Sequence, residues 1–221
     1  MKKTGLFLIG ILSCTSLWAQ DDFGSILSVE VTKKITKGLN LSFEEEHRSH
    51  SNFSATDRFS HCLELSYKPI SVLKVGGAYN PMNYNRGTKG WELRHRYYFY
   101  ATGYWDVGRF TVSLRERFQS TKRQGVTETA KRANPKLYLR SRLSVDYNIR
   151  KSKFEPFATV ELFNTLNDPQ NNRMDRVRLT AGTSYKLKKN HSVQLYYRYT
   201  NNLDEDEVSI HHVGAGYAFK F

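Results

Sequence analysis

The chain ends with the stretch His211-His212-Val213-Gly214-Ala215-Gly216-Tyr217-Ala218-Phe219-Lys220-Phe221, and this stretch decides the fold class. Successive side chains of a β-strand point to opposite faces of the sheet. One face of this stretch therefore carries valine, alanine and three aromatic residues, whereas the other carries histidine, glycine, alanine and lysine. The alternation predicts a strand with one apolar side and one side made of small or polar groups.

The aromatic residues of this stretch are spaced two apart and include the last residue of the chain. Such a carboxyl terminus resembles the sorting signal of bacterial outer-membrane β-barrels. We therefore predict that Tyr217, Phe219 and Phe221 form an assembly signal, which the barrel-assembly machinery would read from the C-terminal strand.

The beginning of the chain has the pattern of a secretory signal peptide. Lys2 and Lys3 precede an apolar run over residues 5–11, and small polar residues lead to Ala19. We predict a signal peptide over residues 1–19 and a single domain over residues 20–221. An apolar run of this length is too short to span a bilayer as a helix. An alternative is a lipoprotein with Cys14 as its lipidated residue, although Leu12 makes the preceding lipobox imperfect.

Charge and cysteine content narrow the class of protein further. The formal net charge is +13, which is also typical of nucleic-acid-binding proteins. The predicted export signal and the scattered arginines argue against a nucleic-acid partner. Loss of the signal peptide would leave Cys62 as the single cysteine, so no intramolecular disulfide is expected. A mean hydropathy of −0.61 does not exclude a membrane β-barrel, because only alternate residues of its strands face lipid.

Segments of about ten alternating residues recur along the chain and are separated by turn signals. We predict an all-β fold, an antiparallel transmembrane β-barrel of about ten strands within a range of ten to twelve. The segment around Leu27 and Val31 would make eleven, but an even number is expected with both termini in the periplasm, so we interpret it as an N-terminal element. Short periplasmic turns are predicted at 37–38, 68–69, 106–108, 150–153 and 188–190, and longer outer loops at 48–56, 81–90, 120–135, 165–173 and 201–207.

The polar faces of these segments carry arginines in pairs, and the carboxylates come from other segments. Arginine or lysine facing lipid near the bilayer midplane costs about 2–4 kcal/mol, so the charged faces are predicted to line the lumen, within bonding range of one another. Arginine suits such a network because its planar fork can bond carboxylates and stack on tyrosine. The predicted lumen network, with a structural or anion-binding role, consists of Arg58, Arg94, Arg96, Arg115, Arg117, Arg140, Arg142, Arg176, Arg178, Arg198, Glu44, Glu46, Glu64, Glu92, Glu155 and Glu161.

Three parts of the sequence together resemble a known family. They are the strand with Leu41, Glu44, Glu46 and Arg48, the strand with Gly76-Gly77-Ala78-Tyr79, and the strand from Arg94 to Tyr100. They are similar to an uncharacterised family of short bacterial outer-membrane β-barrel proteins, whose members are described as a domain of unknown function. The resemblance covers nearly all of the predicted mature chain. It implies the fold and the outer-membrane location, and it supplies no catalytic residues.

A barrel of about ten strands is mostly filled by its own side chains. We therefore expect a largely occluded lumen lined by Arg, Glu and Tyr, with a structural role or a role in binding or transport of small anions. One alternative is a barrel-borne outer-membrane hydrolase acting on lipid or peptide. Another is a soluble periplasmic β-barrel that binds lipid. We expect a monomer in the outer membrane, in contact with its lipid and lipopolysaccharide, without a cofactor.

The sequence contains few residue patterns of a catalytic or metal site. A Ser-His-acid set could be drawn from Ser49, His50, His47, Ser60 or His61, and His61 and His95 have the outward position that an outer-membrane lipase could use. No spacing ties a serine to these histidines, and no G-x-S-x-G motif occurs, so we predict that the protein is not an enzyme and name no catalytic residue.

No H-E-x-x-H or C-x-x-C motif occurs, and no metal site is predicted. The acidic run Asp204-Glu205-Asp206-Glu207 suits a solvated outer loop, or a divalent cation bridging lipopolysaccharide phosphates. The basic residues Lys122, Arg123, Lys131 and Arg132 could meet the same phosphates directly.

Overall fold

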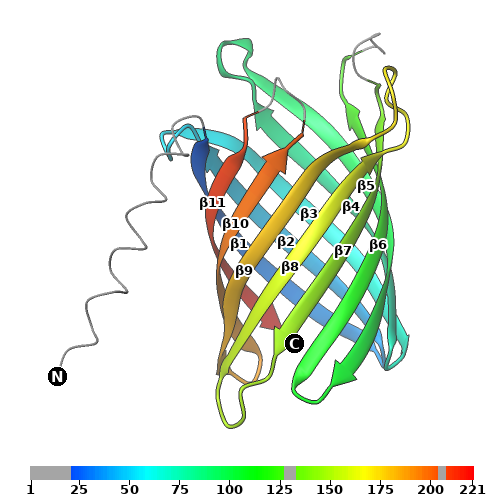
Figure 1. Cartoon of the computed structure of the whole chain (residues 1–221), viewed down its shortest axis with the longest axis vertical. Coiled ribbons are helices and arrows are strands. Elements are labelled where there is room, and N and C mark those ends of the chain that lie inside the picture. The colour runs from blue at the N-terminus through cyan, green and yellow to red at the C-terminus, as the bar shows by residue number, and fades with distance from the viewer. Residues whose placement is uncertain (1–20, 127–132, 204–207) are drawn as a thin grey trace, which may run out of the picture.

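The computed structural model describes residues 21–126, 133–203 and 208–221, and in them the chain forms one closed β-barrel (Figure 1). Predicted positions 1–19, 131–132 and 204–207 lie outside the described residues. Among the described residues, the connection between β4 and β5 contains a 3₁₀ turn, η2 (Gly87–Lys89), and no helix in this part of the chain is long and apolar enough to cross a membrane. The strands are β1 (Asp22–Thr36), β2 (Leu39–His50), β3 (Ala55–Ile70), β4 (Leu73–Asn85), β5 (Trp91–Val107), β6 (Phe110–Arg123), β7 (Lys136–Tyr147), β8 (Phe154–Thr165), β9 (Met174–Lys188), β10 (His191–Asn202) and β11 (Ile210–Lys220).

The described barrel has eleven strands, so the expected number of about ten and the expectation of an even number are both wrong. The N-terminal segment is a full strand, β1, which pairs with β2 on one side and with β11 on the other. All sequential neighbours are antiparallel, but β1 and β11 are parallel, because an odd number of alternating strands leaves the first and last running in the same direction. Backbone bonds fix both ends of this seam: Asp22 N donates to Ser209 O, and Phe221 N donates to Thr32 O.

The parallel seam places the two ends of the described barrel at opposite rims. Asp22 lies at the rim of the longer loops, and the chain end at Phe221 lies at the rim of the short turns (Figure 1). We call these the long-loop rim and the short-turn rim. The connections after β1, β3, β5 and β9 have two residues each, whereas at the opposite rim the described residues 166–173 form a longer loop and twelve residues of the chain separate β6 from β7, as the sequence predicted.

Three connections differ clearly from the expected ones. The loop expected over 81–90 is reduced to 86–90, because β4 continues to Asn85. Pro69 does not begin a turn but lies within β3, where the register with β4 shifts between Tyr67 and Ile70, so its missing N–H disrupts no ladder bond. The connection after β2 is a tight turn over residues 51–54 and not a long loop. Its backbone amides at Ser51 and Asn52 donate to the carboxylate of Asp22 on β1, which satisfies them without a longer connection.

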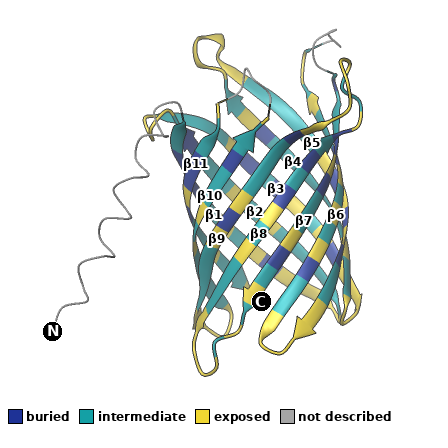
Figure 2. Cartoon of the chain, in the orientation of Figure 1, coloured by how far each residue is buried: buried dark blue, intermediate teal, exposed yellow. Residues whose placement is uncertain are grey.

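Apolar side chains cover the outside of the barrel, and exposed residues alternate with less exposed ones along the strands (Figure 2). Phe99 is 69% exposed, Leu195 56% and Leu63 49%, which in water would be a large unfavourable apolar surface. The buried apolar residues among those described are few: Ile26, Cys62, Met82, Tyr98, Tyr100, Tyr138 and Phe163. The interior thus lacks the apolar lining that a lipid-binding cavity needs, and the wall is one closed layer with no apolar face packed between two sheets.

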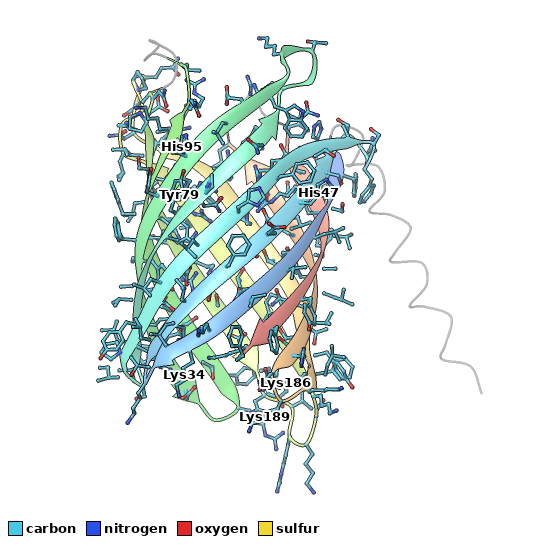
Figure 3. All side chains as sticks on the ribbon, turned by 180° about the vertical axis from the view of Figure 1, so that it is seen from behind. Lys34, His47, Tyr79, His95, Lys186 and Lys189 are labelled. Atoms are coloured by element: carbon cyan, nitrogen blue, oxygen red, sulfur yellow. The ribbon has the colours of Figure 1, made fainter. Side chains whose placement is uncertain are left out.

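Aromatic pairs gather on the outer surface near both rims. Near the short-turn rim, ring centroids lie 4.8 Å apart in Phe110–Tyr147, 4.6 Å apart in Phe154–Tyr185 and 4.7 Å apart in His191–Phe219. Toward the long-loop rim the pairs are His47–Phe59, Tyr79–Tyr97 and Tyr199–His211, all within 5 Å. Figure 3 shows His47, Tyr79 and His95 toward one rim, and Lys34, Lys186 and Lys189 at the other. Two aromatic girdles around an apolar band are typical of membrane β-barrels.

Glycines make room for tyrosine rings that lie across the inner wall. A Cβ on Gly214 would come within 2.1 Å of the Tyr196 ring, and one on Gly76 within 2.6 Å of the Tyr100 ring. Each ring lies over a glycine of the neighbouring strand, an arrangement known to stabilise designed and natural sheets. The tyrosines are thereby held flat against the wall, in position to stack on arginines.

Candidate functional site

A cavity of about 740 Å³ occupies the lumen, so the interior is not filled by its own side chains. Alternation along the strands brings all ten predicted arginines to its lining, together with four of the predicted glutamates, Glu44, Glu46, Glu64 and Glu161. Glu92 and Glu155 are outside the lining. Glu92 accepts a hydrogen bond from Arg94, which does line the cavity, and Glu155 accepts one from Lys186 close to the short-turn rim.

The lining also contains cations that the sequence reasoning left out. Arg48 and Lys74 follow the same inward alternation as their neighbours on β2 and β4, so the two-residue period could have identified them. Arg86, Arg123 and Lys136 lie at or just beyond strand ends, where alternation no longer predicts direction.

Glu161 on β8 is the most heavily used carboxylate of the lumen. One oxygen accepts from Arg140 Nη2 at 2.8 Å and the other from Arg178 Nη1 at 3.2 Å. The side chain of Glu161 is 6% exposed, and Arg140 also donates to Gln119 at 2.7 Å. Buried ion pairs of this kind are held by hydrogen bonds to the remaining polar atoms, and removal of one partner leaves an unpaired buried charge.

On the opposite part of the wall, carboxylates have their own donors. Glu46 receives both a 2.6 Å bond from Arg48 Nε and a 3.0 Å bond from Arg48 Nη2, which is a bidentate pair. Glu64 accepts from the hydroxyls of Tyr98 and Tyr100, and lies 3.5 Å from Lys74 Nζ. These bonds leave little carboxylate capacity for arginines elsewhere in the lumen.

Tyrosine rings hold several guanidinium groups in fixed planes. The guanidinium carbon lies 3.8 Å from the Tyr84 ring centroid for Arg94, 4.0 Å from Tyr98 for Arg117, and 4.6 Å from Tyr100 for Arg115. Cation–π contacts of this kind stabilise the charge by about 0.5–2 kcal/mol each and leave the N–H edges free to donate.

Several of these edges have no acceptor. Within the described residues, the buried Nε atoms of Arg117, Arg140, Arg142 and Arg198 have no hydrogen-bond partner, and neither does Nη2 of Arg123. The carboxylates of Glu46, Glu64 and Glu161 are already engaged by other donors, so they supply no acceptor for these N–H groups.

Charge is distributed unequally around the lumen. From β1 to the loop after β4, four cations (Arg48, Arg58, Lys74 and Arg86) face four carboxylates (Glu30, Glu44, Glu46 and Glu64). From β5 to β10, eleven cations face two carboxylates, Asp146 and Glu161. Glu92 and Asp175 bond Arg94 and Lys136 from outside the lining, and even with them this wall has seven excess positive charges.

The short-turn rim is also basic. The residues within three positions of its turns, or of the chain end, include twelve cations and three carboxylates. The cations are Lys34, Lys37, Lys68, Lys74, Arg109, Arg150, Lys151, Lys153, Lys186, Lys188, Lys189 and Lys220, and the carboxylates are Asp106, Asp146 and Glu155. Figure 3 shows three of the lysines at this rim. At the other rim the sequence has nearly equal numbers of cations and carboxylates.

The histidines considered for catalysis lie on the outer surface and contact other groups. His61 Nδ1 lies 3.2 Å from Glu45 Oε1, and His95 contacts the Tyr79 hydroxyl at 2.7 Å. Neither has a serine partner in the described part of the chain.

Another serine, histidine and acid meet at the long-loop rim. The same ring nitrogen of His50 faces both the Ser51 hydroxyl and Asp22, whereas a catalytic relay uses the two nitrogens separately. Groups of three or more potential metal ligands are absent from the described residues.

The fold and its charged lumen define a porin-like β-barrel protein. Residues 23–209 match the family described as "Protein of unknown function (DUF2490)", and the chain belongs to that family, in agreement with the resemblance seen in its strands. Among solved structures it is similar to the NanC porin, with 14% identity, a TM-score of 0.51, and coverage of 80% of this chain and 86% of the porin chain. At this identity the likeness shows the fold. A search of curated proteins found no match.

Proposed function

We propose that the protein is an outer-membrane β-barrel whose lumen binds small anions and lets them pass. The observation that carries this proposal is the excess of positive charge on the β5–β10 wall of a cavity of about 740 Å³. A cavity lined by one sign of charge within low-dielectric walls concentrates counter-ions of the opposite sign. Rings of Arg and Lys are the usual lining of anion-selective pores.

The outer surface supports the membrane part of the proposal. Apolar side chains such as Leu63, Phe99 and Leu195 are about half exposed or more, and lipid is the solvent in which this surface is stable. The two aromatic girdles match the two interfaces of a bilayer. A closed barrel also leaves no unpaired edge in lipid, and the β1–β11 seam provides this closure.

The basic short-turn rim fits the same function. Lys34, Lys188 and Lys220 belong to strand ends at this mouth of the lumen. By the usual arrangement of such barrels, the short turns face the periplasm. Anions near that mouth would be drawn toward the lumen, where the arginines of β5–β10 continue the positive potential. The resemblance to a porin fold is consistent with this role.

The proposal includes the location and the partners that the sequence suggested. The protein would be inserted in the outer membrane as a monomer after removal of its signal peptide, in contact with membrane lipid and lipopolysaccharide. Tyr217 and Phe219 on β11, with Phe221 beyond it, would present the assembly signal. No catalytic role is assigned to His61 or His95.

Zero-current potential in planar bilayers under a KCl gradient tests the proposed function. We expect measurable current with chloride preferred over potassium. A double variant, Arg115→Gln with Arg142→Gln, should lower this preference, because it removes two positive charges from the β5–β10 wall. Lys89→Gln with Lys122→Gln, at two exposed positions near the long-loop rim and outside the lumen lining, removes the same charge and serves as the control. Absence of current, or preference for potassium, would contradict the proposal.

A further inference from the structure

No hydrogen bond, ion pair or stacked aromatic ring within the described residues holds the side chain of Arg142 on β7. Its Nε is buried without a partner among them. In the sheet its neighbours are Arg115 on β6 and Glu161 on β8. Glu161 would be the natural partner, but its two oxygens already bond Arg140 and Arg178.

Apart from Glu161, the charged groups beside Arg142 are cations. Arg115 lies beside it in register, and Arg117 is two residues further along the same face of β6. Both, together with Arg198, repel the charge of Arg142, whereas Glu161 attracts it. None of these four arginines has a carboxylate within 4 Å among the described residues, since the ion pairs of the lumen involve other arginines. Like charges brought together in a partly buried place destabilise the fold unless an anion is present.

The neighbouring arginines are also held in place before any anion arrives. Arg115 stacks on Tyr100 and its Nε donates to Thr102 at 3.1 Å, which leaves its terminal N–H groups unused. Arg117 stacks on Tyr98, with its Nε unpaired. Guanidinium groups fixed in this way lose little side-chain entropy on binding and offer forked donors that match the oxygens of phosphate, sulfate or carboxylate.

From this arrangement we propose that Arg115, Arg117 and Arg142 form a binding site in the lumen for a divalent oxyanion of the phosphate or sulfate type, free or carried by a small solute. The inference deepens the proposed anion function and rests on it for the route by which the ligand arrives. Three or four oxygens can accept from several forks at once, and two negative charges relieve the repulsion around Arg142. Chloride offers neither directional acceptors nor the second charge.

Thermal unfolding of the purified, folded protein in detergent, followed by heat-dependent gel mobility, tests the site. Sodium sulfate and sodium phosphate are compared with sodium chloride at equal ionic strength, and glycerol phosphate separates a solute-borne group from the free ion. We expect saturable stabilisation by the divalent ions. Sulfate also stabilises proteins generally by exclusion from their surface. That effect does not saturate and is the same in all variants, so it is distinguished from binding.

The variants make the site assignment specific. Arg142→Gln should raise the half-saturating sulfate concentration about tenfold, the equilibrium effect of losing one charge-assisted hydrogen bond. Arg142→Lys keeps the charge without the fork and should have an intermediate effect. Arg115→Gln provides an independent second variant if Arg142→Gln does not fold. Lys89→Gln, in the exposed turn before β5 at the long-loop rim and outside the lumen lining, should leave the half-saturating concentration unchanged.

The outcomes separate this inference from the proposed function. Equal responses to sulfate and chloride, or equal half-saturation in Arg142→Gln and wild type, would overturn the site even if the lumen conducts chloride in bilayers. Saturable sulfate binding that depends on Arg142, in a protein that passes no current, would support the binding site and contradict the proposed passage of anions through the lumen.

Discussion

Replacement of Glu161 by glutamine is the sharpest perturbation of the lumen network. The carboxylate accepts from Arg140 at 2.8 Å and from Arg178 at 3.2 Å, and the three side chains are 6%, 9% and 14% exposed. Removal of one partner of a buried pair costs about 3–5 kcal/mol, because the remaining charge stays buried and unpaired. Here two arginines lose their counter-charge together, so we expect Glu161→Gln to lower the free energy of unfolding by at least about 3 kcal/mol.

The control is the same substitution in an exposed pair of the same barrel. Glu155 bonds Lys186 near the short-turn rim, where the side chains are 34% and 60% exposed, and exposed pairs contribute about 0–1 kcal/mol. Unfolding by urea in detergent micelles, with folded protein measured by heat-dependent gel mobility, gives both values. Equal loss of stability in Glu155→Gln and Glu161→Gln, within about 1 kcal/mol, would refute the description of a buried Glu161 network.

Three other results follow from the architecture. Phe43→Arg, on the outer face of β2, should destabilise the protein in lipid by about 2–4 kcal/mol. Ser42→Arg, on the lumen side and close to carboxylates, should cost much less. Similar costs for the two variants, measured by urea unfolding in vesicles, would contradict the assigned faces of β2. An epitope inserted before Asp22 should be accessible from the same side of the membrane as the loop after β8, because β1 runs parallel to β11 and therefore begins at the long-loop rim. Accessibility of the epitope from the opposite side only would mean an even-stranded barrel. The current through a planar bilayer should be larger at one sign of the applied voltage than at the other. This asymmetry should fall in a Lys34→Gln and Lys188→Gln double variant. A symmetric current in the wild type would contradict the role given to the basic short-turn rim.

The sequence predicts the faces of the strands well because a two-residue period is a property of the extended backbone. Every arginine expected in the lumen lines the cavity, and residues such as Leu63 and Leu195 lie outside as expected. The closure of the barrel could not be predicted in the same way. Pairing of Asp22 with Ile210 joins residues far apart in the chain, and no local signal records that the first strand meets the last in parallel.

Charge balance in the lumen is the other property that alternation does not contain. The pattern places Arg140, Arg142 and Glu161 on the inner face, but it does not show which arginine takes the carboxylate. Register alone does not show it either: Glu161 lies directly beside both Arg142 and Arg178, yet its bonds go to Arg178 and to Arg140. Contacts between distant segments also explain why the connection after β2 is shorter than the sequence predicts. The carboxylate of Asp22 on β1 accepts hydrogen bonds from the turn, which alternation along β2 does not reveal.

The orientation of the strand faces is tested most directly by nitroxide scanning along β9 in reconstituted vesicles. Spin labels at Val177, Leu179 and Ala181 should collide readily with oxygen, which dissolves in lipid, and poorly with a water-soluble nickel chelate. Labels at Arg178 and Thr180, which line the lumen, should show the opposite preference or low access to both reagents. A two-residue alternation of oxygen access is the predicted result. Water exposure at Val177, Leu179 and Ala181, or no alternation along β9, would contradict a membrane barrel with a charged interior.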